Sequence, residues 1–225
     1  MKKLDLILIL DFGSQYTQLI ARRIRELKVY CEIHPYSFDA KKIAIEGKYN
    51  LKGVILSGGP ASVLDKNSPK IDETLLEYFT NNKIPVLGVC YGLQLISFLK
   101  GGKISKSKHR EYGHSQISLT KKSLLFSDTR KNSVVWMSHG DSLNEIPKGF
   151  AITSKSINGV VSSIEHTAGK VYCVQFHPEV NHTEEGKKII SNFVFKICDV
   201  KNKFTPSSFI EEKIREVKNT SGNSN

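Results

Sequence analysis

The sequence of residues 84–96 is IPVLGVCYGLQLI, and this stretch decides the fold class. Ile84 to Val89 has the length and the branched, apolar composition of a strand that is buried on both faces. Apolar side chains then recur at helical spacing from Leu93 to Leu99, and Gly101-Gly102 provides a C-terminal stop. The stretch therefore predicts a buried strand that turns directly into a helix.

Cys90 lies at this predicted turn, between Gly88 and Gly92. A residue held between a strand and a helix must turn sharply, so the residues two positions before and after it need to be small, as in a nucleophile elbow. The helix that follows directs its N–H groups and its dipole at the sulfur, which stabilises a thiolate. Free cysteines are often only small buried hydrophobes, but the paired glycines favour a nucleophile.

The chain before Cys90 predicts βα units of a parallel sheet. Strands are expected at Leu4–Leu10, Val29–Ile33 and Gly53–Leu56, with one helix capped by Ser14 and another at Ile71–Phe79. Units that converge on Cys90 place it at the carboxyl ends of the parallel strands, where open α/β folds have their active sites.

Beyond Gly102, short alternating runs predict further strands that are partly antiparallel. They are expected at Ile117–Leu119, Val134–Trp136, Phe150–Thr153, Val160–Ile164 and Val171–Gln175. The predicted fold class is therefore α/β, with a mostly parallel, flavodoxin-like central sheet flanked by helices and with added antiparallel strands.

Two short motifs are candidates to complete a site around Cys90. His177-Pro-Glu179 follows a predicted buried strand, and in extended chain both side chains project to one side, so the carboxylate can orient the imidazole of a general base. Ser57-Gly58-Gly59-Pro60 follows another strand, and its glycines can present N–H groups to an oxyanion. Weaker candidates, with surface roles as the default, are His139-Gly140-Asp141, His109 and His114.

Composition argues against several classes of protein. Four scattered cysteines show neither a disulfide framework nor metal-ligand spacing, and no membrane span or signal peptide is evident, so a cytoplasmic protein without membrane contact is predicted. The net charge of +11 raises the question of nucleic acid, but only six of the 33 basic residues are arginine, so we expect no nucleic-acid partner. The basic stretch from Lys103 to Arg110 is either a docking face or, by default, a solvated edge.

Several segments resemble a known family. They are DFGSQYTQLIARRIRE (11–26), LSGGP (56–60), GVCYGLQL (88–95), EYG (111–113), VWMSHGD (135–141) and QFHPEVNHT (175–183). Together they resemble the class I (triad) glutamine amidotransferases and, within these, the amidotransferase domain of GMP synthetases, from about Leu6 to Cys198.

The resemblance implies site residues and a reaction. Cys90, His177 and Glu179 would form a triad that hydrolyses L-glutamine to glutamate and ammonia, and the ammonia would convert XMP to GMP. The implied oxyanion hole consists of the N–H groups of Gly59 and Tyr91, and the implied glutamine-binding residues are Gly58, Gln94, Ser138, His139, Gly140 and Asp141, the last four in a loop.

The resemblance also implies a division of the chain. Residues 1–199 would form the amidotransferase domain, and residues 200–225 a connector, with a helix after Ser208, towards an ATP pyrophosphatase domain whose SGGxDS loop is absent here. No cofactor is expected in this chain, since ATP and Mg would belong to that domain, and the full-length enzyme would be a homodimer.

Alternatives remain at this point. The chain could serve another acceptor, such as chorismate or carboxyphosphate, or act as a stand-alone cysteine hydrolase. It could also be a basic binding module with an inert Cys90.

Overall fold

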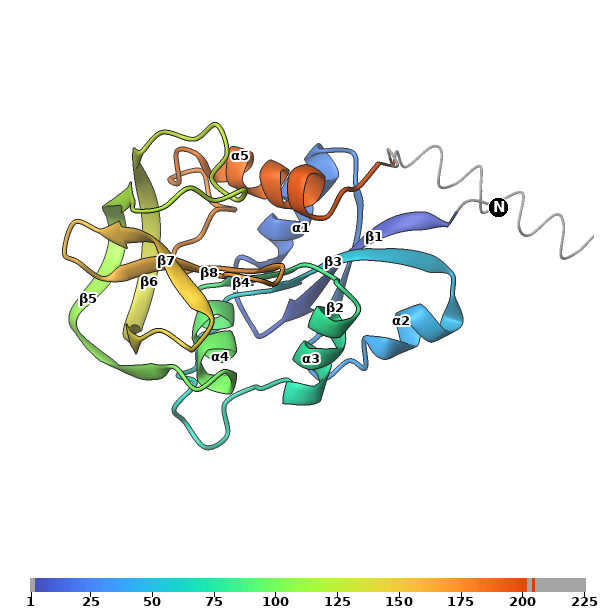
Figure 1. The fold of residues 1–225 in the computed structure, drawn as a ribbon, viewed down its shortest axis with the longest axis horizontal. Coiled ribbons are helices and arrows are strands. Elements are labelled where there is room, and N and C mark those ends of the chain that lie inside the picture. The colour runs from blue at the N-terminus through green and yellow to red at the C-terminus, as the bar shows by residue number, and fades with distance from the viewer. Residues whose placement is uncertain (1–2, 202–203, 205–225) are drawn as a thin grey trace, which may run out of the picture.

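The computed structural model describes residues 3–201 and 204, whose strands form one nine-stranded sheet in the order β2-β1-β3-β4-β9-β8-β7-β5-β6 (Figure 1). The strands are β1 (Leu4–Asp11), β2 (Tyr30–Pro35), β3 (Tyr49–Leu56), β4 (Val86–Val89), β5 (Lys103–Leu119), β6 (Asn132–Glu145), β7 (Phe150–Ser156), β8 (Val161–His166) and β9 (Val171–Val174). The helices are α1 (Thr17–Glu26), α2 (Lys41–Glu46), α3 (Glu73–Asn81), α4 (Tyr91–Leu99), α5 (Gly186–Ser191) and the π-helix η1 (Asn192–Ile197).

The parallel half of the sheet, β2-β1-β3-β4-β9, is covered by helices on both faces. Because successive side chains of a strand point to opposite faces, β1 contributes to two cores. Ile7 and Ile9 pack with residues of α1 and α5, whereas Leu6, Leu8 and Leu10 pack with residues of α2, α3 and α4. Figure 1 shows α1 and α5 on one side of the sheet and α2, α3 and α4 on the opposite side.

The other half of the sheet is antiparallel. β9 pairs with β8 in antiparallel orientation, and β8-β7-β5-β6 continue in the same way. The predicted fold class, α/β with a parallel sheet flanked by helices and added antiparallel strands, is therefore confirmed, although the antiparallel pairs are as many as the parallel ones.

The prediction of two short strands at Ile117–Leu119 and Val134–Trp136 is wrong in extent. β5 begins at Lys103 and β6 continues to Glu145, so the basic stretch and the predicted Ser138–Asp141 loop both lie in strands. β6 alternates between buried and more exposed residues, but its buried positions include His139 and Asp141. Polar side chains on the buried face conceal the alternation that would otherwise predict a strand.

The prediction that Ser14 caps the first helix is also corrected. The Ser14 hydroxyl accepts the N–H of Tyr16 at 3.0 Å within a turn, but α1 begins only at Thr17 and has no side-chain cap. α3 begins at Glu73, two residues after the predicted start, because the Asp72 carboxylate accepts the Thr74 N–H at 2.8 Å and caps the helix.

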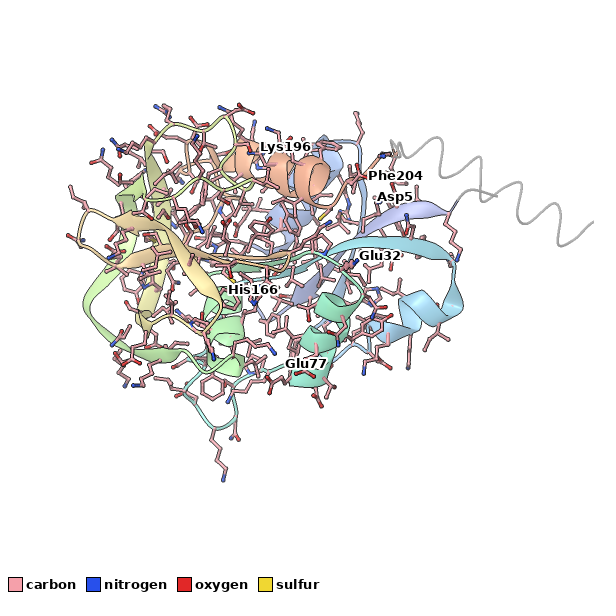
Figure 2. All side chains as sticks on the ribbon, viewed as in Figure 1. Asp5, Glu32, Glu77, His166, Lys196 and Phe204 are labelled. Carbon is pink, nitrogen blue, oxygen red and sulfur yellow. The ribbon has the colours of Figure 1, made fainter. Side chains whose placement is uncertain are left out.

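The end of the described chain returns to the start of β1. The Lys201 N–H donates to the Asp5 carboxylate at 3.0 Å, and the Phe204 ring lies 5.0 Å from the ring of Tyr30. Figure 2 labels Asp5 and Phe204 at this end of the sheet. Almost all of the predicted connector, including the helix after Ser208, lies outside the described residues. Among the residues that are described, no helix is long and apolar enough to cross a membrane.

Candidate active site

Cys90 occupies a strained turn between β4 and α4. Its φ of 52° and ψ of −103° are unusual for a residue with a side chain, and its N–H donates to the carbonyl of Val174 at 2.8 Å. A Cβ added to Gly88 would lie 2.7 Å from the carbonyl of Gly92, and one added to Gly92 would lie 2.5 Å from the carbonyl of Leu56. Both glycines are therefore required by close packing around the turn.

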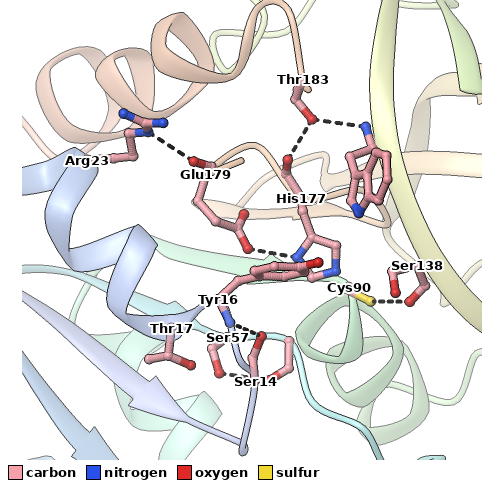
Figure 3. A network of polar contacts seen from close by, with 12 residues as sticks. Ser14, Tyr16, Thr17, Arg23, Ser57, Cys90, Ser138, His177, Glu179 and Thr183 are labelled. Carbon is pink, nitrogen blue, oxygen red and sulfur yellow. Dashed lines mark hydrogen bonds and ion pairs between the residues drawn. The ribbon is translucent and has the colours of Figure 1, made fainter. Parts of the chain in front are cut away.

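His177 lies next to this turn, directly after β9. Its Nδ1 is 2.7 Å from Oε1 of Glu179, and both side chains are buried. Figure 3 shows the imidazole between the carboxylate of Glu179 and the sulfur of Cys90. The Tyr16 ring meets the imidazole edge-on, with the centroids 5.0 Å apart. The structure thus brings together the three residues that the sequence motifs indicate as a triad.

The backbone around His177 is fixed by further hydrogen bonds (Figure 3). The His177 N–H donates to the Trp136 carbonyl at 3.0 Å, and the Thr183 hydroxyl donates to the His177 carbonyl at 2.6 Å while accepting the Trp136 N–H at 3.0 Å. Nε of Arg23 donates to the Glu179 carbonyl at 2.9 Å. No local pattern in the sequence indicates the role of Thr183, because its contact depends on the position of β6.

The electrostatics favour a charged imidazole. Burial disfavours the charged ring, yet the carboxylate of Glu179 and the sulfur of Cys90 outweigh burial and raise the pKa of His177 well above its ordinary value. In contrast, burial raises the pKa of the Cys31 thiol to about 11 and also raises the pKa values of Cys173 and Cys198. These three cysteines are therefore held as thiols.

A cavity of about 600 Å³ opens beside Cys90. Its walls come from the turns after β1 and β3, from the start of α4, and from the β5–β6 hairpin. The lining residues are Gly13 to Tyr16, Gly59 to Ser62, Cys90, Gln94, Lys106, Tyr112, Ser138 to Asp141, and His177. Such a volume suits a small molecule.

Most of the predicted ligand-binding residues line this cavity, but two do not. The side chain of Tyr91 points away, with its hydroxyl donating to the Pro69 carbonyl at 2.6 Å. Gly58 is not among the lining residues, although a Cβ added to it would lie 3.0 Å from Cε1 of His177. His114 lies elsewhere, with its ring 5.2 Å from that of Trp136, and the side chain of His109 is outside the described part.

Sequence reasoning missed several lining residues. Gln15 and Tyr16 belong to a segment that indicates only a turn and a helix, and Lys106 and Tyr112 belong to the long hairpin, for which the sequence predicts strands that are too short. Ser62 hydrogen-bonds the carboxylate of Asp141 across the cavity. Among the described residues, no three His, Cys, Asp or Glu side chains are grouped so that they could hold a metal ion.

Comparison with known proteins identifies the family of the chain. A family model described as glutamine amidotransferase class-I matches residues 8–197. The chain belongs to this family. A putative GMP synthase subunit from Thermoplasma acidophilum has the same fold, with a TM-score of 0.74 and 30% sequence identity over 95% of this chain and 98% of that one. A glutamine amidotransferase from Methylobacillus flagellatus has a TM-score of 0.60 and 17% sequence identity over 80% of this chain and 72% of that one. At this identity it supports the fold alone.

The curated relatives of this class-I amidotransferase are longer than the chain. It is 46% identical over 222 residues to a protein from Brachyspira hyodysenteriae named GMP synthase [glutamine-hydrolyzing], covering 99% of this chain and 42% of the relative. A Clostridium kluyveri protein of the same name is 48% identical over 218 residues, covering 97% and 41%. The chain thus spans about two-fifths of the length of these relatives.

Proposed function

We propose that this class-I amidotransferase hydrolyses L-glutamine to glutamate and ammonia through a thioester at Cys90. The observation that carries the proposal is the placement of Cys90 at a strained strand–helix turn, facing an imidazole that is itself bonded to a carboxylate at 2.7 Å. A nucleophile, a base and a group that orients the base are the parts that nucleophilic catalysis requires.

In the first half of the reaction, Cys90 acts as the nucleophile. The raised pKa of His177 favours an imidazolium beside the sulfur of Cys90. The sulfur attacks the side-chain amide carbon of glutamine and forms a C–S bond, while negative charge develops on the amide oxygen. The C–N bond then breaks, and His177 gives its proton to the departing nitrogen, which leaves as ammonia.

In the second half, water completes the hydrolysis. The now neutral His177 takes one proton from a water molecule, whose oxygen attacks the thioester carbon. The C–S bond breaks, glutamate leaves, and the thiolate and imidazolium are restored. Throughout, Glu179 holds the ring by its Nδ1–H and stabilises its charge.

Binding roles complete the proposal. The N–H groups of Gly59, which lines the cavity, and of Tyr91, which begins α4, would hold the oxyanion. Gln94 and Ser138 to Asp141, with Gly58 beneath His177, would hold the substrate. A cavity of about 600 Å³ lined by hydroxyl, amide and charged groups supports an amino-acid ligand.

The acceptor of the ammonia is the second part of the proposal. Because the relatives of more than twice this length are named GMP synthase [glutamine-hydrolyzing], we infer that the ammonia is used by a C-terminal ATP pyrophosphatase domain to convert XMP to GMP. ATP and Mg would bind in that domain, residues 200–225 would lead to it, and the assembled enzyme would be a cytoplasmic homodimer. A second candidate is that the chain is a separate amidotransferase subunit for the same reaction. This candidate is favoured by the Thermoplasma relative, which is named a GMP synthase subunit and of which this chain covers 98%.

The test uses a glutamine analogue with a diazoketone or chloroketone group in place of the amide. It should alkylate Cys90 and spare the buried Cys31, Cys173 and Cys198. Cys90→Ala should abolish glutamate release while far-ultraviolet circular dichroism shows an unchanged fold. Even labelling of all four cysteines, or hydrolysis by Cys90→Ala at the wild-type rate, would show that Cys90 is not the nucleophile.

A further inference from the structure

A second buried histidine–carboxylate contact lies at the wall of the same cavity. Nε2 of His139 on β6 is 3.4 Å from Oε2 of Glu111 on β5, and the two residues are directly opposite in the antiparallel register. Their side chains are only 1% and 5% exposed. Ionisable side chains are rarely buried so completely without a role, because removing them from water costs free energy.

The hydrogen bonds around His139 fix the place of its proton. Nδ1 lies 2.9 Å from the carbonyl oxygen of Asp141, and a carbonyl oxygen can only accept, so Nδ1 must carry a proton. This arrangement directs the other ring nitrogen, Nε2, at Glu111. Within the described chain, neither Nε2 of His139 nor Oε2 of Glu111 has a hydrogen-bond partner of its own, so each faces only the other.

Glu111 is held as a carboxylate by its surroundings. Its Oε1 accepts the Ser156 hydroxyl at 2.8 Å and the Asn158 amide at 3.0 Å. Burial disfavours the charged form, but the contact with His139 and the hydrogen bonds from Asn158 and Ser156 keep the pKa of Glu111 below its ordinary value. The carboxylate of Glu111 faces Nε2 of His139 at 3.4 Å and thereby fixes the orientation of the ring.

The effect of this pair reaches the cavity through Asp141. The Asp141 carbonyl accepts both from His139 and from the Gln94 amide, at 3.2 Å, and its carboxylate accepts from Ser62 on the facing loop. Gln94, His139 and Asp141 all line the cavity. The chain of contacts therefore runs from Glu111, through the ring of His139, to the backbone of a residue that lines the cavity.

We propose that Glu111 is a positioning residue that acts through His139 on Asp141 and thereby sets the affinity of the cavity for glutamine. This inference rests on the proposed function, because it concerns the same cavity. His139 lines the cavity, whereas Glu111 contacts His139 and does not line the cavity. The effect of Glu111 on binding is therefore indirect.

The test compares two Glu→Gln variants on the same hairpin. Glu111→Gln removes the charge facing His139, whereas Glu145→Gln, at the exposed end of β6, removes a charge that pairs with Lys103 in solvent. Glu111→Gln should raise KM for glutamine about tenfold or more, corresponding to about one charge-assisted hydrogen bond, and lower kcat by a smaller factor. Glu145→Gln should have the wild-type KM.

Direct binding separates this inference from the proposed function. Calorimetry with Cys90→Ala should detect glutamine, and adding Glu111→Gln to that variant should weaken binding about tenfold. If Cys90→Ala binds no glutamine, the proposed function fails and the inference fails with it. If binding is equal with and without Glu111, the inference alone is overturned.

A measurement on the unmodified chain covers the case in which Glu111→Gln does not fold. In ¹⁵N-histidine-labelled protein, the His139 ring, assigned by loss of its signals in His139→Gln, should carry a proton on Nδ1, whereas the more common neutral form carries it on Nε2. An unprotonated Nδ1 would mean that the bond to Asp141 does not exist, and the inference would fall.

Discussion

Replacing Glu179 with Gln should lower kcat/KM for glutamate release by about 10- to 150-fold. The amide keeps the volume of the side chain and an oxygen that can accept the Nδ1–H of His177, now 2.7 Å away, but it loses the charge. A hydrogen bond to a charged group contributes about 1.5–3 kcal/mol. Since about 1.4 kcal/mol corresponds to tenfold in rate, the loss of this contribution in the transition state gives the stated range.

The same variant should shift the pH profile in a defined direction. Glu179 is one of the two groups that raise the pKa of His177, so removing its charge should lower that pKa. Activity is lost as the pH rises through the pKa of His177, because a neutral ring has no proton for the departing ammonia. The alkaline limb of kcat/KM should therefore move to lower pH in Glu179→Gln.

The assay is glutamate release, measured from about pH 6 to pH 10 with the wild type, Glu179→Gln and Glu165→Gln. Glu165 lies on β8 outside the cavity and serves as the matched control for loss of one carboxylate. His177→Ala should be more damaging than Glu179→Gln, with a loss of about 10²- to 10⁴-fold or more. An unshifted alkaline limb, or a Glu179 variant worse than His177→Ala, would show that the two roles are misassigned.

Three further changes test other parts of the structure. Thr183→Val should lower kcat/KM about tenfold, because it leaves the Trp136 N–H and the His177 carbonyl without their partner, whereas Thr183→Ser should keep most activity. Gly92→Ala should lower the free energy of unfolding in denaturant by about 1–3 kcal/mol, because the new Cβ would meet the Leu56 carbonyl; an unchanged midpoint would contradict this close packing. Joining the chain to a synthetase domain, with ATP and XMP present, should raise glutaminase kcat/KM about 5- to 150-fold, and equal rates would exclude such coupling.

The sequence predicts the parallel half of this fold well, because burial on both faces leaves a plain signal there. β1 and β4 are nearly unbroken apolar runs, and Gly88 and Gly92 mark the turn at Cys90. His177 and Glu179 are two residues apart, so their contact depends only on local geometry. Elements and contacts of this kind can be predicted from neighbouring residues alone.

The antiparallel half is harder to predict, for a physical reason. The buried positions of β6 include His139 and Asp141, which are polar because they belong to the cavity wall. The partner of His139 is Glu111, 28 positions earlier in the sequence, and only the register of the β5–β6 hairpin brings them together. Lys106 and Tyr112 reach the cavity by the same pairing, which local patterns do not encode.

The fixation of His177 has a consequence for the path of the product. Its ring is bonded to Glu179, and its backbone N–H and carbonyl are bonded to Trp136 and Thr183, so the imidazole would have to break its bond to Glu179 in order to swing during a turnover. The nitrogen that receives a proton must come to the ring. In the proposed reaction, ammonia would therefore be released beside His177, which lies directly after β9 and is bonded to Trp136 of β6, and any conduit for it would have to start there.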